Sequence, residues 1–386
     1  MTKETRDPLV TVKDLHVDFD VRDGIVHAVD GASFNIYRGE TLGIIGESGC
    51  GKSITAKAIM NMIPKQGKVS GEITFYEKVK EGDGEIINEI RIDQTDPDGE
   101  VIRKIRGGHI AMIFQEPMNS LTPVYTAGFH IMEAVHLHRF VSAEKVGDQM
   151  GKNIQKKRGV TDAEAREISI EMLRRVGIPN AEKRVDSYPH ELSGGQRQRV
   201  MIAIALSTFP DLLIADEPTT ALDVSIEAQI LDLMRELQET QDMAIMFITH
   251  NLGVIAEIAD EIVVMYMGKE VERSDTIEIF ENPKHPYTAA LLGSIPQIGE
   301  KKGQLATIEG MVPNPFNLPP GCVFHPRCPE YMPGKCDRVY PGYAEVEEGH
   351  WARCLLYDGC WPDTPEAQAI KNQTVTATSS VQAAAD

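Results

Sequence analysis

A glycine-rich octapeptide near the N-terminus holds the residues best suited to phosphate chemistry. Residues 46–53 read GESGCGKS, which matches G-x-x-x-x-G-K-[ST] and lies between an apolar run and a predicted helix. The loop N–H groups and the helix N-terminus can then cradle phosphates, while Lys52 reaches the β- and γ-phosphates and Ser53 binds Mg²⁺. We interpret Cys50 as a passive filler rather than a redox switch, although its place before a helix predicts a lowered thiol pKa. The expected nucleotide contacts in the loop are Gly46, Ser48, Gly49, Cys50, Gly51, Lys52 and Ser53.

A pair of adjacent acids supplies the second chemical signal. Asp216 and Glu217 end the apolar run 212–215, and a buried carboxylate is costly unless a partner compensates its charge. A Mg²⁺ ion supplies that compensation, with Asp216 in the metal shell, directly or through water, and Glu217 polarising the attacking water. Together with the loop at 46–53, these acids predict a P-loop NTPase.

Alternating strands and helices are expected to position these groups. The predicted strands lie at 9–21, 25–36, 41–45, 110–114, 212–215, 244–248 and 261–267, and the predicted helical segments at 52–62, 162–176 and 200–206. A fold in which strands alternate with helices is α/β, with parallel strands in its core. Residues from about 121 to 190 are expected to form a helical subdomain.

Composition excludes some functions and localisations. Lys and Arg number 39 against 58 Asp and Glu, so the net charge is −19, which argues against a nucleic-acid-binding protein. No apolar run approaches the roughly 20 residues of a membrane span, and the N-terminus lacks the apolar region of a signal peptide. We therefore expect a cytosolic chain. The segment 77–100 holds nine acids against three bases and is predicted to be an inserted, solvated loop or hairpin rather than a binding surface.

The pentapeptide LSGGQ at 192–196 narrows the interpretation. It precedes an apolar helix, stands 20 residues before Asp216, and closely resembles the signature of ABC-transporter ATPase subunits. The resemblance covers about residues 9–280 and implies an ABC-type domain with a mixed-sheet core and a helical subdomain. It implies ATP and Mg²⁺ as cofactors and adds further site residues: Phe19, Gln115 and His250. By this resemblance Phe19 stacks on adenine, although its position in the strand also allows packing in the core. The resemblance also implies that Gln115, in the motif FQEP, touches Mg²⁺ and water, and that His250 contacts the γ-phosphate.

Other positions in the resemblance act across a dimer. In this family two ATPase chains meet head to tail, so that the signature of one closes on the ATP of the other. The residues implied to act on the partner's ATP are Ser193, Gly194, Gly195, Gln196 and Asp223, the last in the motif ALD. The helical segment is implied to dock cytoplasmic loops of a membrane subunit.

The C-terminal part resembles a more specific group. ENPKHPYT at 281–288 and GCVFHPRCP at 321–329 resemble the C-terminal extension of dipeptide/oligopeptide permease ATPases. This implies the motor of a peptide importer on the cytoplasmic face of the membrane, a paralogous ATPase partner in a heterodimer, two transmembrane permease subunits and an extracytoplasmic peptide-binding protein. Import of nickel or glutathione, or a non-transport ABC ATPase, are the alternatives. The expected boundaries are 1–280 for the ATPase domain, 281–362 for the extension and 363–386 for a disordered tail.

Five of the six cysteines crowd into the extension. The spacing of Cys322, Cys328, Cys336 and Cys354 is C-x5-C-x7-C-x17-C, without the close pairs that zinc sites usually have. Iron–sulfur clusters accept more varied spacings, and members of the resembled family carry a [4Fe–4S] cluster on such cysteines. We therefore expect a cluster, with zinc and with free or disulfide-linked thiols as alternatives, and Cys360 as the spare residue. We interpret the cluster as structural, with redox sensing as the alternative.

Overall fold

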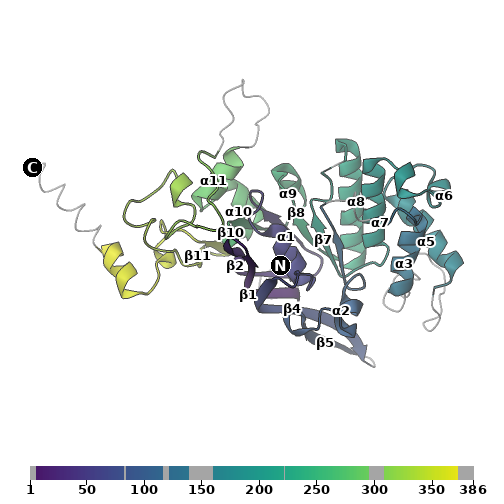
Figure 1. Ribbon diagram of the computed structural model, residues 1–386, viewed down its shortest axis with the longest axis horizontal. Helices are drawn as coiled ribbons and strands as arrows, with labels where there is room; N and C mark the ends of the chain where they lie inside the picture. The colour runs from purple at the N-terminus through teal and green to yellow at the C-terminus, as the bar shows by residue number, and fades with distance from the viewer. Residues whose placement is uncertain are drawn as a thin grey trace, which may run out of the picture.

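An eight-stranded sheet forms the centre of the computed structural model, which describes residues 6–81, 84–115, 121–138, 160–220, 222–294 and 308–372. The strand order is β11-β12-β10-β9-β3-β8-β7-β6 (Figure 1). From β9 to β6 the pairings are parallel, and from β9 to β11 they are antiparallel. The strands are β3 (Thr41–Ile45), β6 (Ile110–Ile113), β7 (Leu212–Asp216), β8 (Ala244–Ile248), β9 (Glu261–Tyr266), β10 (Lys269–Asp275), β11 (Ala344–Glu347) and β12 (His350–Ala352). The parallel strands β3, β7 and β8 are buried throughout, as their continuous apolar sequences predict.

A second, antiparallel sheet packs on the first. Its order is β2-β1-β4-β5. The strands are β1 (Pro8–Val21), β2 (Gly24–Tyr37), β4 (Gly67–Glu81) and β5 (Gly84–Arg91). Alternate residues of β1 and β2 enter one apolar core shared with β3, β7 and helix α1. The first part of the acidic segment, up to Arg91, lies in the β4–β5 hairpin, with Glu77 opposite Asn88 and Lys78 opposite Ile87, and the rest continues through a 3₁₀ helix (Ile92–Gln94) to the start of α2. This agrees with the predicted loop or hairpin, although residues 82 and 83 lie outside the described part.

Helices cover the parallel sheet and extend from it to one side. They are α1 (Lys52–Ile59), α2 (Glu100–Ile105), α3 (Ala127–Leu137), α5 (Asp162–Arg175), α6 (Ala181–Arg184), α7 (Gly194–Leu206), α8 (Val224–Gln241), α9 (Leu252–Ile258), α10 (Thr276–Glu281) and α11 (Pro286–Gly293). α3, α5 and α6 gather beyond α7 and α8 (Figure 1) and share their core with α7. Within the predicted helical segment, residues 139–159 lie outside the described ranges.

Local signals explain where two of these helices begin and end. Thr161 and Glu164 form a capping box at the start of α5, and Gly177, with a φ of 71°, follows its end. Helix α1 is shorter than the predicted 52–62. Asn61 takes a φ of 49°, which no helical residue has, so the chain turns before Pro64 is reached.

The C-terminal extension has little regular structure and a small core of its own. β12 pairs with β10, so the extension adds to the central sheet, and five buried residues form a separate cluster around Trp361. Residues 365–372 are helical and Ala367 is buried in that cluster. The prediction of a disordered tail from residue 363 is therefore wrong up to residue 372, because Ala367 finds apolar partners; residues 373–386 lie outside the described part.

Candidate functional site

The glycine-rich loop connects β3 to α1, as predicted. Gly46 has a φ of 148°, and a Cβ there would lie 2.2 Å from the carbonyl oxygen of Met265. Gly51 has a φ of 104°, and a Cβ there would lie 2.3 Å from the carbonyl oxygen of Ala28. Because β9 and β2 lie this close to the loop, side chains are excluded at both positions, and only glycine allows the loop to follow this path.

Lys52 is the first residue of α1 and is buried. Its Nζ donates to the carbonyl oxygens of Gly46 at 2.7 Å and Glu47 at 3.0 Å. The ammonium group is therefore held inside the curve of the loop, where phosphates of a nucleotide would sit. Cys50 beside it is 2% exposed, and burial raises the pKa of its thiol. The predicted lowering of that pKa is wrong, because desolvation outweighs the helix N-terminus and Lys52.

Ser53 and Asp216 join the loop to the end of β7. Ser53 Oγ donates to Asp216 Oδ1 at 3.1 Å, and Asp216 is 3% exposed. Burial raises the pKa of Asp216, and the neighbouring Glu217 adds to the rise. A desolvated carboxylate beside a hydroxyl is a donor set that fits Mg²⁺, since the hard cation accepts oxygen ligands and offsets the buried charge.

Glu217, Gln115 and His250 meet where β6, β7 and β8 end. Gln115 Nε2 donates to Glu217 Oε2 at 3.0 Å, and His250 Nδ1 lies 3.3 Å from Glu217 Oε1. Glu217 has a φ of 49°, and its backbone N–H donates to Ile248 of β8 at 2.8 Å, which turns the side chain out of the sheet edge. Two residues far apart in sequence thus contact the carboxylate of Glu217, as expected for groups at the carboxyl ends of parallel strands. Glu116 and Pro117 of the predicted FQEP motif lie outside the described residues.

Comparisons with known proteins agree with this geometry. A family model described as ABC transporter matches residues 29–220, and one described as the oligopeptide/dipeptide transporter C-terminal region matches residues 271–336. The dipeptide transport ATP-binding protein DppD of Bacillus subtilis is 43% identical over 352 residues, which cover 91% of this chain and 95% of the relative. A putative peptide import ATP-binding protein of Brucella ovis is 45% identical over 361 residues, which cover 92% and 98%.

The chain belongs to the ABC transporter ATP-binding proteins. A solved dimeric ATP-binding cassette in a post-hydrolysis state, bound to ADP and Pi, has a TM-score of 0.55 and 26% identity and covers 69% of this chain and 98% of its own. The chain is thus an ATP-hydrolysing ABC subunit. No helix in the described ranges has the length and apolar character needed to cross a membrane.

The ABC signature lies at the start of α7. Ser193 caps the helix, accepting the N–H of Gln196 at 3.3 Å, while its own N–H donates to Gln196 Oε1 at 3.1 Å. Ser193 is exposed, and nothing lies within 4 Å of a Cβ built on Gly194. Asp223 caps α8 through the N–H of Ile226 at 3.0 Å. Ser193 and Asp223 thus cap the helices that they precede, and both side chains are exposed. Ala221 of the ALD motif lies outside the described residues.

Phe19 of β1 is half-buried. Its ring lies against Gly67 of β4, where an added Cβ would come within 2.8 Å of it, and it borders the core between the sheets. This packing is the structural role that the strand phase allowed, and adenine stacking stays a prediction.

Four of the extension's cysteines converge. Burial is the largest cause that raises the pKa of each thiol, to about 12 for Cys354 and about 11 for Cys328. Neighbouring thiols add to the rise at Cys322, Cys328 and Cys354. Backbone N–H groups also approach the sulfurs, including those of Phe324 and His325 at Cys322. Cys360 is separate, with its thiol donating to the carbonyl of Ala352 at 3.2 Å. The chemistry of this donor set, four buried thiols with N–H donors, fits a thiolate-bound metal group.

A second group of possible ligands lies beside the extension. Glu278, Glu347 and His350 bring ligand atoms within 4.8 Å of one another, the one such trio found among the described residues. Lys284 already pairs with Glu347, and Asn282 donates to both carboxylates. His350 Nε2 donates to the carboxylate of Glu272 at 2.7 Å. The trio is therefore engaged with protein partners.

Sequence reasoning missed two residues that contact the loop. Arg327 forms two hydrogen bonds with Glu47, and the hydroxyl of Tyr287 accepts the N–H of Glu47. Both lie in the segments that carried the permease resemblance. The resemblance was the one sequence feature that pointed to these residues. Contacts between residues 240 and 280 positions apart produce no local sequence pattern from which they could be predicted.

Proposed function

We propose that this chain hydrolyses ATP to drive the import of dipeptides or oligopeptides through a membrane permease. The observation that carries the proposal is the convergence of Gln115 and His250 on Glu217, beside the Ser53–Asp216 pair. The names of the relatives, both peptide transport proteins over more than nine-tenths of this chain, supply the substrate class. Nickel and glutathione remain the alternative substrates.

The residues divide the work at the γ-phosphate. Lys52 and the loop N–H groups bind and orient the phosphates, and Ser53, Asp216 and Gln115 would hold Mg²⁺, which neutralises phosphate charge when bound. Glu217 accepts a hydrogen bond from the attacking water and aligns it. His250, whose side chain is 67% exposed, contacts the γ-phosphate and holds Glu217 in place. This is catalysis by positioning and electrostatics.

The site is completed by a second ATPase chain. Ser193, Gly194, Gly195, Gln196 and Asp223 are proposed to act on ATP held by the partner. The exposed start of α7 suits this role, because a helix N-terminus attracts anions and Gly194 leaves room for a phosphate. The dimeric state named for the solved cassette supports this arrangement. We favour a heterodimer with a paralogous chain.

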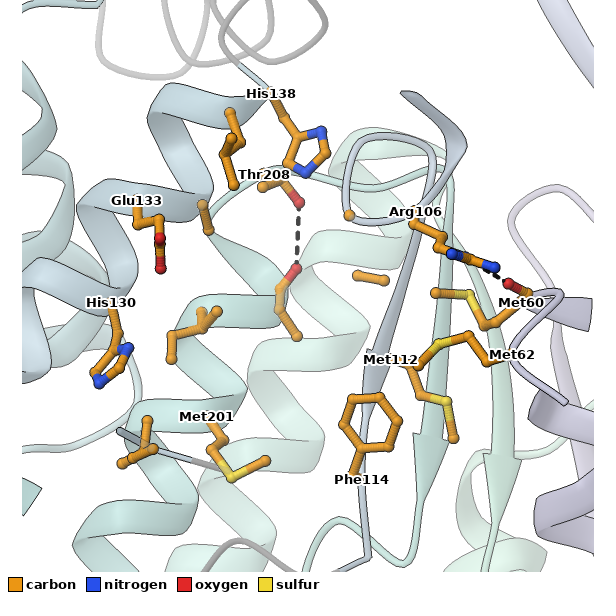
Figure 2. A pocket seen from close by; sticks show the side chains of 17 residues that line it. Met60, Met62, Arg106, Met112, Phe114, His130, Glu133, His138, Met201 and Thr208 are labelled. Atoms are coloured by element: carbon orange, nitrogen blue, oxygen red, sulfur yellow. Dashed lines mark hydrogen bonds between the residues drawn. The ribbon is translucent and has the colours of Figure 1, made fainter. Parts of the chain in front are cut away.

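The permease is proposed to dock in a groove between the sheet and the helical segment. The groove has a volume of about 440 Å³. Figure 2 shows His130 and Glu133 of α3 on one side of it and Met112 of β6 and the following Phe114 on the other, with Met201 of α7 between them. Methionine-rich walls adapt to an apolar partner helix. Phe114 immediately precedes Gln115 in the chain. A permease helix bound in the groove would therefore contact the residue next to the one that hydrogen-bonds Glu217. This would place the chain on the cytoplasmic face of the membrane, with an extracytoplasmic binding protein delivering peptide.

The cysteines Cys322, Cys328, Cys336 and Cys354 are proposed to hold a [4Fe–4S] cluster with a structural role. No three of the described thiols lie within 4.8 Å of one another, whereas zinc bonds of about 2.3 Å would bring sulfur atoms about 3.8 Å apart. The sequence spacing of the four cysteines, which lacks the close pairs usual in zinc sites, favours a cluster over a single zinc ion. The small apolar core of the extension supports a structural role, and redox sensing is the alternative.

Glu217→Gln tests the function in the assembled transporter. We expect the variant to bind ATP as the wild type does and to lose ATPase activity about a thousandfold, with loss of dipeptide uptake into vesicles. Asp232→Gln on the exposed face of α8 is the control and should retain both activities. Equal hydrolysis by Glu217→Gln would reject the catalytic assignment. Uptake of nickel or glutathione but not of peptides would reject the substrate class.

A further inference from the structure

The loop that carries two of the clustered cysteines also reaches the ATP-binding loop. Arg327 lies between Cys322 and Cys328, in a short 3₁₀ helix (His325–Arg327). Its Nη1 donates to Glu47 Oε2 at 2.6 Å and its Nη2 to Glu47 Oε1 at 3.0 Å. The Arg327 side chain is 3% exposed, and the hydrogen bonds with Glu47 are the main cause that raises its pKa. A buried, two-point Arg–carboxylate pair fixes both orientation and position.

The backbone of Glu47 is held from the same side. Its N–H donates to the hydroxyl of Tyr287 on α11 at 2.8 Å. Tyr287 is fully buried, with its ring 4.7 Å from that of Tyr266 and 5.3 Å from that of Phe324. Burial raises the pKa of Tyr287, so the phenol stays neutral and accepts the hydrogen bond at all physiological pH values. Side chain and main chain of Glu47 are thus both attached to residues beyond 280.

Glu47 in turn borders the phosphate-binding curve. Its carbonyl accepts Lys52 Nζ at 3.0 Å and the N–H of Cys50 at 3.3 Å. A shift of Glu47 would therefore move the lysine and the loop N–H groups together. Without Arg327, the carboxylate of Glu47 would also leave an unpaired negative charge in the phosphate-binding loop.

We propose that Arg327 is a positioning residue for ATP binding, through which the C-terminal extension pre-shapes the phosphate loop. The inference rests on the proposed role of residues 46–53 in binding ATP, and it adds that nucleotide affinity depends on an element outside the ATPase core. Arg327 is not one of the residues proposed to bind the phosphates or to align the water. Its effect passes through Glu47, which it both orients and neutralises.

Binding and kinetics of Arg327→Gln test the proposal in the full chain. We expect the Kd for ATP and the KM to rise about tenfold, with kcat at saturating ATP within twofold of the wild type, because the hydrolysis residues are untouched. Arg327→Lys should recover only part of the affinity, since an ammonium cannot bind both carboxylate oxygens. Arg338→Gln, an exposed arginine of the same extension, is the matched control and should bind ATP as the wild type does.

Glu47→Gln changes the Arg327–Glu47 ion pair from the side of the phosphate-binding loop and leaves the extension unaltered. It should weaken ATP binding less than Arg327→Gln, because no unpaired anion is then left in the phosphate-binding loop. The double variant should be no weaker than Arg327→Gln, which shows that Arg327 acts through Glu47. Wild-type affinity in Arg327→Gln, equal losses in Arg338→Gln, or strictly additive losses in the double variant would overturn the proposal. A wild-type chain that fails to bind ATP would instead reject the proposed function.

Discussion

Gln115 donates a hydrogen bond to the carboxylate of Glu217, and its neighbour Phe114 forms part of the wall of the groove. One end of this connection is the surface proposed for the permease, and the other is the residue proposed to align water. A movement of the groove wall therefore changes the position of an amide that orients Glu217. This gives docking and hydrolysis a direct physical link.

Gln115→Ala should separate docking from hydrolysis. Loss of the hydrogen bond leaves Glu217 less well oriented, and we expect the ATPase rate of the complete transporter to fall about tenfold. The permease should still bind, because Phe114 and Met112 remain. ATPase assays and pull-down with the permease in detergent check both parts. A variant that hydrolyses normally with the permease bound would contradict the link.

Asp216→Asn should stabilise the chain in the absence of Mg²⁺ and nucleotide while abolishing hydrolysis. Burial raises the folded-state pKa of Asp216, so its charged form opposes folding at neutral pH. We expect a gain of about 1 kcal/mol, or a Tm increase of about 2 °C, at pH 7.5. The gain should vanish at acid pH, because a carboxyl with a raised pKa is protonated there and stabilises the fold as the amide does. Calorimetry at both pH values, with Asp232→Asn as the exposed control, checks the sign. A destabilised Asp216→Asn would contradict it.

Tyr343→Phe should loosen the extension. The Tyr343 hydroxyl donates to the buried carboxylate of Glu270, which also accepts the N–H of Ser33 at 2.9 Å. Removing one donor leaves a desolvated oxygen less well satisfied, at a cost of about 1–3 kcal/mol. Thermal unfolding should shift downward, and proteolysis should release the extension sooner. Tyr340→Phe, whose ring lies nearer the surface, is the control; equal behaviour of the two variants would refute the role of Glu270.

Cys354→Ala and Cys360→Ala should differ in iron content. Cys354 lies among the converging thiols, whereas Cys360 bonds to a backbone carbonyl. Anaerobically purified Cys354→Ala should lose most of its iron and sulfide and its visible absorbance, and Cys360→Ala should keep them. Iron analysis and absorbance spectra provide the measurement. A colourless wild-type protein loaded with zinc would reject the cluster.

The parts of the site that the sequence predicted are those in which the chemistry is local. Lys52 and Ser53 follow from eight consecutive residues, and Asp216 and Glu217 from the end of one apolar strand. The contact of Gln115 with Glu217 depends on β6 lying next to β7. The α/β pattern in the sequence predicts parallel strands but does not say which strands are neighbours.

Other features depend on the tertiary fold. Cys50 has the sequence position of a reactive thiol, yet Lys52 and the loop bury it and the desolvation cost raises its pKa. The sequence around Arg327 gives no local sign of its ion pair with Glu47, because that contact forms only in the folded chain. The helix 365–372 lies in a segment whose polar composition predicted disorder, and the buried Ala367 with the partly buried Ile370 attaches it to the cluster around Trp361.

Pairing of β12 with β10 gives the extension a further consequence. Without β12, the strand β10 would become the open edge of the central sheet, with unpaired backbone N–H and C=O groups at Glu272 and Arg273. Such an edge can recruit strands from other molecules. A chain that ends before residue 344 would therefore expose the edge of β10, through which copies of the chain could associate. By covering this edge, β12 also protects the ATPase domain from aggregation.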